Sequence, residues 1–338
     1  MHQVWITRYG PPEVLALREA ATPQPATGEV LIKVAAAGVN FADIMARLGL
    51  YPDAPKPPCV VGYEVAGEVA AVGPSVAEFK TGDKVIALTR FGGYASHVSV
   101  RKEQVFALPP GLELAQGAAL PVTYLTAYQL LVAMGRLREG ETVLVHSAAG
   151  GVGLSALNLA TIIGARVIGV ASAAKHDFLR QRGVHGLIDS RATDMVDRVK
   201  QLTNGRGVDL VLDARGGRSW RESYDCLSPT GRLAMFGLAT AVGGGRWVGT
   251  VRALFGVPWL RFNPLRLMND NRGVFGVNLG HLWDQHAMIR GWMEQLLAWQ
   301  AQGKITPVLD RSFPFAEAPA AHRHIEGRGN IGKVLLVP

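Results

Sequence analysis

Cysteine is scarce in this chain of 338 residues: only Cys59 and Cys226 occur, and they are far apart in the sequence. Two cysteines at that separation cannot form a disulfide framework. The first residues lack the basic and apolar regions of a secretory signal peptide and enter a strand-like pattern directly. We therefore expect a protein of the reducing cytoplasm.

Long, uninterrupted hydrophobic runs are also absent. Residues 114–135 and 142–165 approach the roughly 20 apolar residues that cross a bilayer. The first stretch contains Pro121 and several polar side chains, and the second is broken by a glycine-rich turn. We interpret both as buried core segments rather than membrane spans.

No arm or block of one charge sign occurs either. Lys and Arg total 35 and Asp and Glu total 27, which gives a net charge of +8, but the basic residues are scattered singly. Such an excess can attract anions, including phosphorylated cofactors. The scatter is typical of a solvated basic surface, and we expect no dedicated nucleic-acid binding.

What the chain does have is an ordinary globular composition, with 48% hydrophobic and 18% charged residues. Its length fits two domains of roughly 150 residues each. Residues 1–110 show short strands separated by glycine and proline, typical of a barrel or sandwich. Between residues 142 and 236, strands and helices alternate, which indicates βαβ units and a parallel sheet. Residues 330–338 return to the β-rich pattern, so we infer an α/β fold with a nucleotide-binding domain inserted into a discontinuous one.

The clearest motif is a phosphate-binding loop. Strand-like residues 143–146 lead into Ser147-Ala148-Ala149-Gly150-Gly151-Val152-Gly153, and a helical pattern follows. This is a dinucleotide fingerprint with Ala148 in the place of its first glycine. Gly150 lets the backbone approach a pyrophosphate, Gly153 lets the helix pack closely, and the helix N-terminus favours an anion. The strand–loop–helix context favours this interpretation over a structural glycine-rich turn.

The end of the next strand indicates which dinucleotide is bound. NAD-selective sites usually have Asp or Glu there for the ribose hydroxyls, but this chain has Ser172 and then Lys175. A hydroxyl and an ammonium suit a 2′-phosphate, and one charge-assisted hydrogen bond is worth roughly 1.5–3 kcal/mol. The alternative is a solvated Lys175 at a helix start. We predict NADP as the cofactor.

Several motifs follow one another in a fixed order along nearly the whole chain. They are residues 40–47 (NFADIMAR) with Gly49 and Tyr51, 62–64 (GYE) with Gly67, 82–85 (GDKV), 148–153, 172–176, 271–273 (NRG) and 330–338 (NIGKVLLVP). In this the chain resembles the medium-chain dehydrogenase/reductase superfamily, in its quinone oxidoreductase group. The closest likeness is to the vesicle amine transport protein-like branch.

The resemblance implies a GroES-like, β-rich catalytic domain of residues 1–118 and 273–338. A Rossmann domain with a doubly wound parallel sheet, residues 119–272, is inserted into it. It also implies a homodimer and the reduction of a carbonyl or an activated double bond with NADPH. The residues matched to cofactor contacts are 148–153 for the pyrophosphate, Ser172, Lys175 and Arg328 for the 2′-phosphate, and the backbone of Phe236, Gly237, Phe275, Gly276 and Val277 for the nicotinamide amide. Ser190 is a departure, because it stands where relatives have a tyrosine near the adenosine ribose.

Zinc ligands are missing from the matched positions. Zinc-dependent members use a cysteine, the histidine of a Gly-His-Glu motif, and a later cysteine or acid. Here Tyr63 replaces the histidine, and no cysteine stands near Asn40. His322 and His324 are expected on different faces of one helix and make a poor ligand pair. We predict no metal, and a zinc label attached by fold analogy should be doubted.

Without a metal, hydrogen-bond donors must stabilise the developing charge. Tyr51 follows Asn40 and Asp43 at the spacing of enoyl-thioester reductases of the superfamily, where the tyrosine is the proposed acid. Tyr51 is thus either the proton donor or an aromatic wall of the substrate pocket. Asn40 is expected to touch the nicotinamide ribose or the substrate, or to be a turn residue at a strand end. Asp43 either belongs to the site or caps the helix that starts after Asn40.

Two further residues are candidates for the substrate pocket. Tyr63 lines it or packs under the glycine-containing strand. Thr126 meets both the nicotinamide and the substrate, or is a core threonine. We expect a lid or a core segment in residues 243–272, where Trp247, Leu254, Phe255 and Trp259 are spread between arginines. The alternatives for that segment are contact with an anionic membrane and a dimer surface.

The favoured function is a zinc-independent, NADPH-dependent oxidoreductase that reduces quinones or α,β-unsaturated carbonyls. One alternative is an enoyl-thioester reductase. Another is a nucleotide-binding protein with little turnover that acts at membranes or through partners.

Overall fold

The computed structural model describes residues 1–239 and 262–338. The chain folds into two compact units. The first unit comprises Met1–Leu125 and Leu279–Pro338, and the second comprises Thr126–Asn278. Over the residues that the structure describes, no helix is long and apolar enough to cross a membrane.

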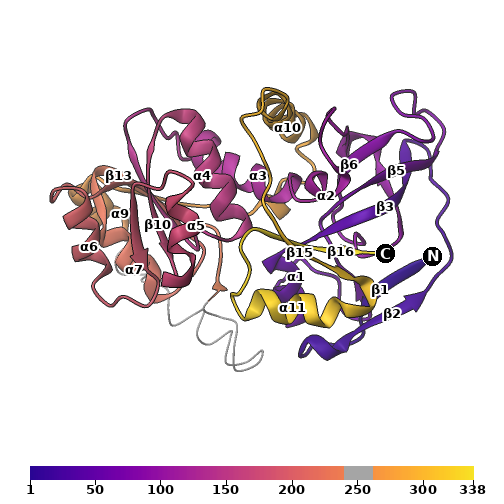
Figure 1. Ribbon diagram of the computed structural model, residues 1–338, viewed down its shortest axis with the longest axis horizontal. Coiled ribbons are helices and arrows are strands. Elements are labelled where there is room, and N and C mark those ends of the chain that lie inside the picture. Colours follow the sequence, from indigo (N-terminus) through magenta and orange to yellow (C-terminus); the bar gives the residue numbers. More distant parts are fainter. Residues whose placement is uncertain (240–261) are drawn as a thin grey trace. The chain divides into compact units, whose positions relative to one another are not determined.

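The first unit is built on two β-sheets (Figure 1). One has the strand order β2-β1-β4. The other has the order β15-β16-β3-β5-β6-β8, with β7 also paired to β3, and only β15 and β16 run parallel. The strands are β1 (His2–Ile6), β2 (Leu15–Glu19), β3 (Glu29–Val39), β4 (Cys59–Val60), β5 (Glu64–Val72), β6 (Lys84–Leu88), β7 (His97–Arg101), β8 (Val105–Ala107), β15 (Leu309–Pro314) and β16 (Lys333–Val337). Their buried faces, with Ile32, Val65 and Val334, form one apolar core.

Helices fill the connections of the first unit. They are α1 (Phe41–Arg47), α2 (Leu114–Gly117), α10 (His286–Ala301) and α11 (Ala318–Glu326). The C-terminal strand β16 pairs antiparallel with β3, with Leu335 opposite Gly38. This pairing adds the C-terminal segment to a sheet of the N-terminal third, as the β-rich pattern of residues 330–338 predicts.

The second unit is a six-stranded parallel sheet with the order β11-β10-β9-β12-β13-β14. The order reverses between β9 and β12, which makes this a doubly wound sheet. Its strands are β9 (Thr142–His146), β10 (Arg166–Ala171), β11 (Gly186–Asp189), β12 (Val208–Asp213), β13 (Leu227–Met235) and β14 (Gly273–Gly276). Its helices are α4 (Gly151–Ile163), α5 (His176–Arg180), α6 (Met195–Leu202), α7 (Arg218–Asp225) and α9 (Pro264–Asp270). The predicted fold class is confirmed.

Two boundaries differ from the sequence prediction. The strand β14 pairs in parallel with β13, with Val274 beside Leu233, so it extends the sheet of the second unit. Placing residues 273–278 in the catalytic domain is therefore wrong, because a short apolar run does not reveal which sheet it joins. The helical pattern of residues 115–134 is divided into α2, α3 (Pro121–Tyr128) and a π-helical turn, η3 (Gln129–Ala133), and the units divide after Leu125 rather than at residue 118.

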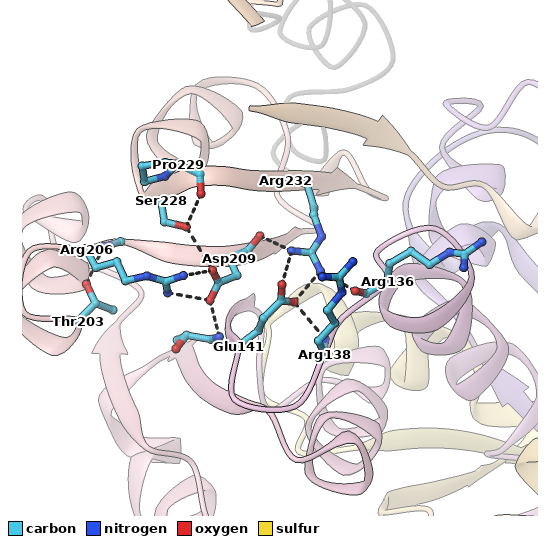
Figure 2. A network of polar contacts seen from close by, with 11 residues as sticks. Arg136, Arg138, Glu141, Thr203, Arg206, Asp209, Ser228, Pro229 and Arg232 are labelled. Carbon is cyan, nitrogen blue, oxygen red and sulfur yellow. Dashed lines mark hydrogen bonds and ion pairs between the residues drawn. The ribbon is translucent and has the colours of Figure 1, made fainter. Parts of the chain in front are cut away.

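A polar network ties together the amino ends of the central strands of the second unit (Figure 2). Asp209 accepts hydrogen bonds from the backbone N–H of Thr142 at 2.8 Å and from the two terminal nitrogens of Arg206 at 2.6 and 3.0 Å. The Ser228 hydroxyl donates to Asp209 at 3.3 Å. Arg232 forms a bidentate ion pair with Glu141 at 2.7 and 3.2 Å. This network lies at the edge opposite to the one where parallel sheets bind ligands.

Candidate functional site

The phosphate-binding loop has the predicted strand–loop–helix geometry. Ser147 adopts a positive φ of 54° directly after β9, and the Gly150 N–H closes the turn on the Ser147 carbonyl at 2.8 Å. A Cβ on Gly153 would lie 2.4 Å from that carbonyl oxygen, so only glycine fits there. On Gly150, a Cβ would meet only the Ser147 carbonyl, at 3.3 Å. The backbone is thus open at Gly150, and the first turn of α4 has N–H groups without helical partners, which fits a bound pyrophosphate.

The residues predicted for the adenosine end lie together beyond β10 and β11. Ser172 directly follows Ala171, and the Lys175 N–H donates to the Ser172 carbonyl at 2.9 Å. The Ser190 N–H donates to the Ala171 carbonyl at 2.9 Å, which places Ser190 beside the end of β10. Ser172 and Ser190 are half-buried. A hydroxyl and an ammonium therefore occur at the strand end where an acid would select NAD.

The residues predicted for the nicotinamide end follow neighbouring strands. Phe236 and Gly237 come directly after β13, and the Phe236 N–H donates to the Asp213 carbonyl at 3.1 Å. Phe275 and Gly276 end β14, and the Val277 N–H donates to the Met235 carbonyl at 2.9 Å. All these segments reach the carboxyl edge of the sheet that also carries the phosphate-binding loop. Thr126, on α3, is half-buried and begins the second unit.

In the first unit, Asn40 lies in a buried polar cluster with Glu64 and Lys333. The Lys333 ammonium donates to Asn40 Oδ1 at 2.6 Å and forms a short ion pair with Glu64. Asn40 Nδ2 donates to Glu64 Oε1 at 3.0 Å and to the Gly38 carbonyl at 3.4 Å, and the Val122 N–H donates to Glu64 Oε2 at 2.7 Å. Both hydrogens of the Asn40 amide are engaged, so Asn40 can accept one more hydrogen bond but cannot donate.

Sequence reasoning missed Glu64 and Lys333 as partners of Asn40. Glu64 is 0% and Lys333 3% exposed, which is rare for charged residues unless they are paired. The only sign of this cluster in the sequence is Lys333, a charged residue at the start of the apolar strand pattern of residues 333–337. It gave no indication of the partner, which is 269 residues away in the sequence.

Asp43 is fully buried and does cap the helix. Its carboxylate accepts hydrogen bonds from the backbone N–H of Asn40 at 2.7 Å and from that of Gly62 at 3.0 Å. Tyr94 donates a third from its hydroxyl. Burial raises the pKa of Asp43 to about 7, against the lowering effect of these donors and of Lys333. The helix-cap interpretation of Asp43 is confirmed, and the same bonds fix the loop that precedes Tyr63.

The Tyr94 hydroxyl also lies 3.3 Å from His322 Nε2. Because Tyr94 donates to Asp43, the His322 ring must be the donor in this contact. Burial, aided by the charge of Arg47, lowers the pKa of His322 to about 3. Sequence reasoning considered His322 only as a metal ligand, and the structure places it in a buried hydrogen-bonded chain with Tyr94 and Asp43.

This chain predicts a distinct pH dependence of stability. Below about pH 6.5 an unfolded His322 binds a proton that the folded ring, with a pKa of about 3, does not accept. Protons then favour the unfolded state, so this group makes the free energy of unfolding fall as the pH drops. Asp43 acts in the opposite sense, since its raised pKa favours the folded state at low pH.

Comparing variants separates the two groups. Between about pH 7.5 and about pH 5, wild type is expected to lose about 2 kcal/mol more stability than His322→Gln. Urea unfolding of both proteins at each pH measures this difference, and the contribution of Asp43 cancels in it. Equal losses would show that His322 is protonated in the folded protein.

Tyr51 and Tyr63 form an aromatic pair. Their ring centroids are 6.2 Å apart with an interplanar angle of 79°, and the Tyr63 ring also packs at 5.4 Å on Phe91. The Tyr63 hydroxyl is buried and has no hydrogen-bond partner among the described residues. Burial, with the Asp43 charge, raises its pKa, so the hydroxyl stays protonated. A buried donor without a partner next to Tyr51 fits the wall of a binding pocket.

Two of the predicted site features, Arg328 and the lid, are not among the groups of residues described above. Arg328 is exposed in the turn after α11, in the first unit. Most of the predicted lid, including Trp247, Leu254, Phe255 and Trp259, lies outside the described residues. The described part of that segment, α9, has Leu265 and Met268 exposed.

Comparisons with known proteins agree with both units. Two family profiles match, "Alcohol dehydrogenase GroES-like domain" over residues 26–110 and "Zinc-binding dehydrogenase" over residues 182–336. The human synaptic vesicle membrane protein VAT-1 homolog is 40% identical over 327 residues, which cover 96% of this chain and 82% of that protein. The chain belongs to the medium-chain dehydrogenase/reductase superfamily.

Solved structures of this superfamily have the same fold. The Escherichia coli quinone oxidoreductase complexed with NADPH has a TM-score of 0.88 and 30% identity, with 100% of both chains covered. The CurK enoyl reductase has a TM-score of 0.86 and 30% identity, with 99% of this chain and 98% of that chain covered. The zinc named in one family profile has no counterpart among the described residues, which contain no cluster of three His, Cys, Asp or Glu able to hold a metal ion.

Proposed function

We propose that this protein is a zinc-independent, NADPH-dependent oxidoreductase that reduces quinones or α,β-unsaturated carbonyls. The observation that carries the proposal is the phosphate-binding loop from Ser147 to Gly153 at the carboxyl edge of a doubly wound sheet. Ser172 and Lys175 at the end of β10 favour the 2′-phosphate of NADPH. The Escherichia coli relative complexed with NADPH supports the same cofactor.

The chain's own residues would hold the cofactor and the acceptor. The backbone at Gly150–Gly153 would bind the pyrophosphate, and Phe236, Gly237 and the end of β14 the nicotinamide amide. When bound, NADPH supplies a hydride. Asn40 would accept a hydrogen bond from a hydroxyl of the cofactor or substrate, since its amide has no free donor. Tyr51 and Tyr63 would line the acceptor pocket, and the protonated hydroxyl of Tyr63 can meet the developing negative charge.

The direct test is oxidation of NADPH and NADH by the purified protein. An ortho-quinone, a simple enone and an enoyl-thioester are offered in parallel, with and without a metal chelator. Turnover that is faster with NADPH than with NADH, and insensitive to the chelator, is expected. NADPH binding without turnover on any acceptor would overturn the proposal that the protein is an enzyme and would favour a nucleotide-binding protein. Loss of activity with the chelator would overturn zinc independence.

The enoyl-thioester reductase is the second candidate. The order Asn40, Asp43 and Tyr51, and the structural likeness to the CurK enoyl reductase, favour it. It predicts that a crotonyl-thioester is reduced faster than any quinone in the same assay. The homodimer stays a prediction of the family resemblance, and a membrane contact stays an alternative for residues 243–272.

Lys175 gives a sharper test of the cofactor assignment. Lys175→Ala is expected to weaken NADPH binding roughly 10- to 100-fold, because it removes a charge-assisted hydrogen bond to the 2′-phosphate. NADH lacks this phosphate, so its affinity should stay unchanged. Titration of reduced-nicotinamide fluorescence measures both dissociation constants. Arg180→Ala is the matched control, since Arg180 is an exposed base nearby that pairs with Asp177. Equal weakening of NADPH and NADH would contradict the role of Lys175.

A further inference from the structure

A buried polar cluster lies where the two central strands of the second unit separate. The β9–β12 ladder ends with Val145 beside Leu212, and the next residue on each strand is His146 and Asp213. This is the point where the strand order reverses, and doubly wound sheets bind their ligands in the crevice outside it. His146 is 1% and Asp213 0% exposed. The cluster therefore lies beneath the expected cofactor crevice.

The Asp213 carboxylate is saturated with hydrogen bonds. Oδ1 accepts from the N–H groups of Arg215 at 2.7 Å and Gly216 at 3.2 Å. Oδ2 accepts from the hydroxyls of Ser219 at 2.6 Å and Ser223 at 2.7 Å. The hydrogen bonds from Ser219, Ser223 and the Arg215 N–H lower the pKa of Asp213 against the raising effect of burial, so it stays ionised. Asp213 thus fixes both the turn after β12 and the start of α7.

Ser223 links this cluster to β9 by a hydrogen bond, and His146 Nε2 also lies 3.9 Å from Asp213 Oδ2. The Ser223 hydroxyl hydrogen is given to Asp213, so its oxygen accepts from His146 Nε2 at 3.0 Å. Burial lowers the pKa of His146, which keeps the ring neutral with its proton on Nε2. Ser219 has the same chemistry towards the same carboxylate oxygen but has no such contact with His146. The residue after His146 is Ser147, where the phosphate-binding loop begins.

The same cluster borders the nicotinamide-side loop. A Cβ on Gly216 would lie 3.0 Å from the Gly237 carbonyl oxygen, and one on Gly237 would lie 2.5 Å from the Ala214 carbonyl oxygen. The turn that Asp213 fixes therefore packs against the Phe236–Gly237 backbone. The Asp213 carboxylate thus connects three loops at the carboxyl edge of the sheet. They are the turn after β12, the Phe236–Gly237 loop that packs against it and, through Ser223, the phosphate-binding loop.

We propose that the Asp213–Ser223–His146 chain of hydrogen bonds is a positioning device that holds the phosphate-binding loop in its cofactor-binding conformation. The inference rests on the proposed function, because it assigns Ser223 a role in NADPH affinity. None of these three side chains is expected to touch the cofactor. If the link is broken, a smaller fraction of the protein has the loop in the competent conformation, and the apparent dissociation constant rises by the same factor.

The chain offers two matched controls for Ser223→Ala. Ser219→Ala removes an equal hydrogen bond to Asp213 Oδ2 but leaves the His146 link. Ser228→Ala removes a buried serine–aspartate bond at the opposite edge of the sheet, the one to Asp209 (Figure 2). NADPH dissociation constants come from fluorescence titration. Hydrogen exchange of the Ala148 and Gly150 amides, measured without cofactor, reports the loop directly.

Ser223→Ala is expected to raise the NADPH dissociation constant roughly tenfold, equivalent to about 1.4 kcal/mol. It should also speed exchange of both loop amides. The two controls should stay within about threefold of wild type. Equal effects of Ser219→Ala and Ser223→Ala, or no effect of Ser223→Ala, would overturn the proposal. If wild type binds no NADPH, the proposed function fails, while the exchange comparison still decides this inference.

A second pair of variants covers the case in which Ser223→Ala does not fold. His146→Gln keeps an N–H donor towards Ser223, whereas His146→Leu removes it together with the buried Nδ1, which has no partner among the described residues. His146→Gln is expected to bind NADPH within about threefold of wild type, and His146→Leu roughly tenfold more weakly. Equal affinities of the two variants would refute the positioning role.

Discussion

Lys333→Met is expected to lower the free energy of unfolding by about 3–5 kcal/mol, because it leaves Glu64 as a buried charge without its partner. Both side chains are almost fully buried, with 4% and 0% of their side-chain areas exposed. The remaining donors to Glu64 are Asn40 Nδ2 and the Val122 N–H. Neither carries a charge, so they compensate the carboxylate only in part.

Two controls make this expectation specific. Lys80→Met removes an ion pair of 2.9 Å with Asp83 on the surface, where the Lys80 side chain is 85% exposed. Such a pair contributes less than about 1 kcal/mol. The double variant Glu64→Gln/Lys333→Met should recover most of the loss, since no unpaired charge remains. Urea unfolding measures all three. A loss in Lys333→Met no larger than in Lys80→Met would show that water reaches Glu64.

The fold could be predicted because its signals are local. Between residues 142 and 236, each strand and each helix has its own spacing of apolar residues, which can be recognised within the element. The loop from Ser147 to Gly153 has the residue types that its backbone geometry requires. Gly153, for example, packs so closely against the Ser147 carbonyl that no other residue fits there. The place of β14 could not be predicted, since four residues with an apolar pattern fit either sheet.

The cofactor half of the candidate site follows from sequence better than the catalytic half does. Its residues come directly after successive strands, and parallel strands bring their carboxyl ends to one edge. Asn40, Glu64 and Lys333 come from three separate segments, and only packing brings them together. His146 and Ser223 have no sequence signature at all, because a buried histidine and a helical serine are common core residues.

Tyr51→Phe is expected to lower kcat for enone reduction roughly 10²- to 10⁴-fold, the range that general-acid catalysis contributes. Enone reduction places the hydride on the β-carbon and a proton on the α-carbon, and the Tyr51 hydroxyl is the proposed donor of that proton. Quinone reduction places its protons on oxygens that exchange readily with water. The loss with an ortho-quinone should therefore be much smaller, and the ratio of the two losses is the quantity to measure.

Tyr51→Leu separates the proton donor from the aromatic wall. The phenylalanine variant keeps the ring that packs at 6.2 Å against Tyr63 and removes only the hydroxyl. The leucine variant removes both. If Tyr51 donates the proton, both variants lose kcat for the enone alike. If Tyr51 is only a wall, Tyr51→Phe keeps wild-type turnover and Tyr51→Leu raises KM. Steady-state kinetics of both variants on both acceptors therefore decides between the two roles.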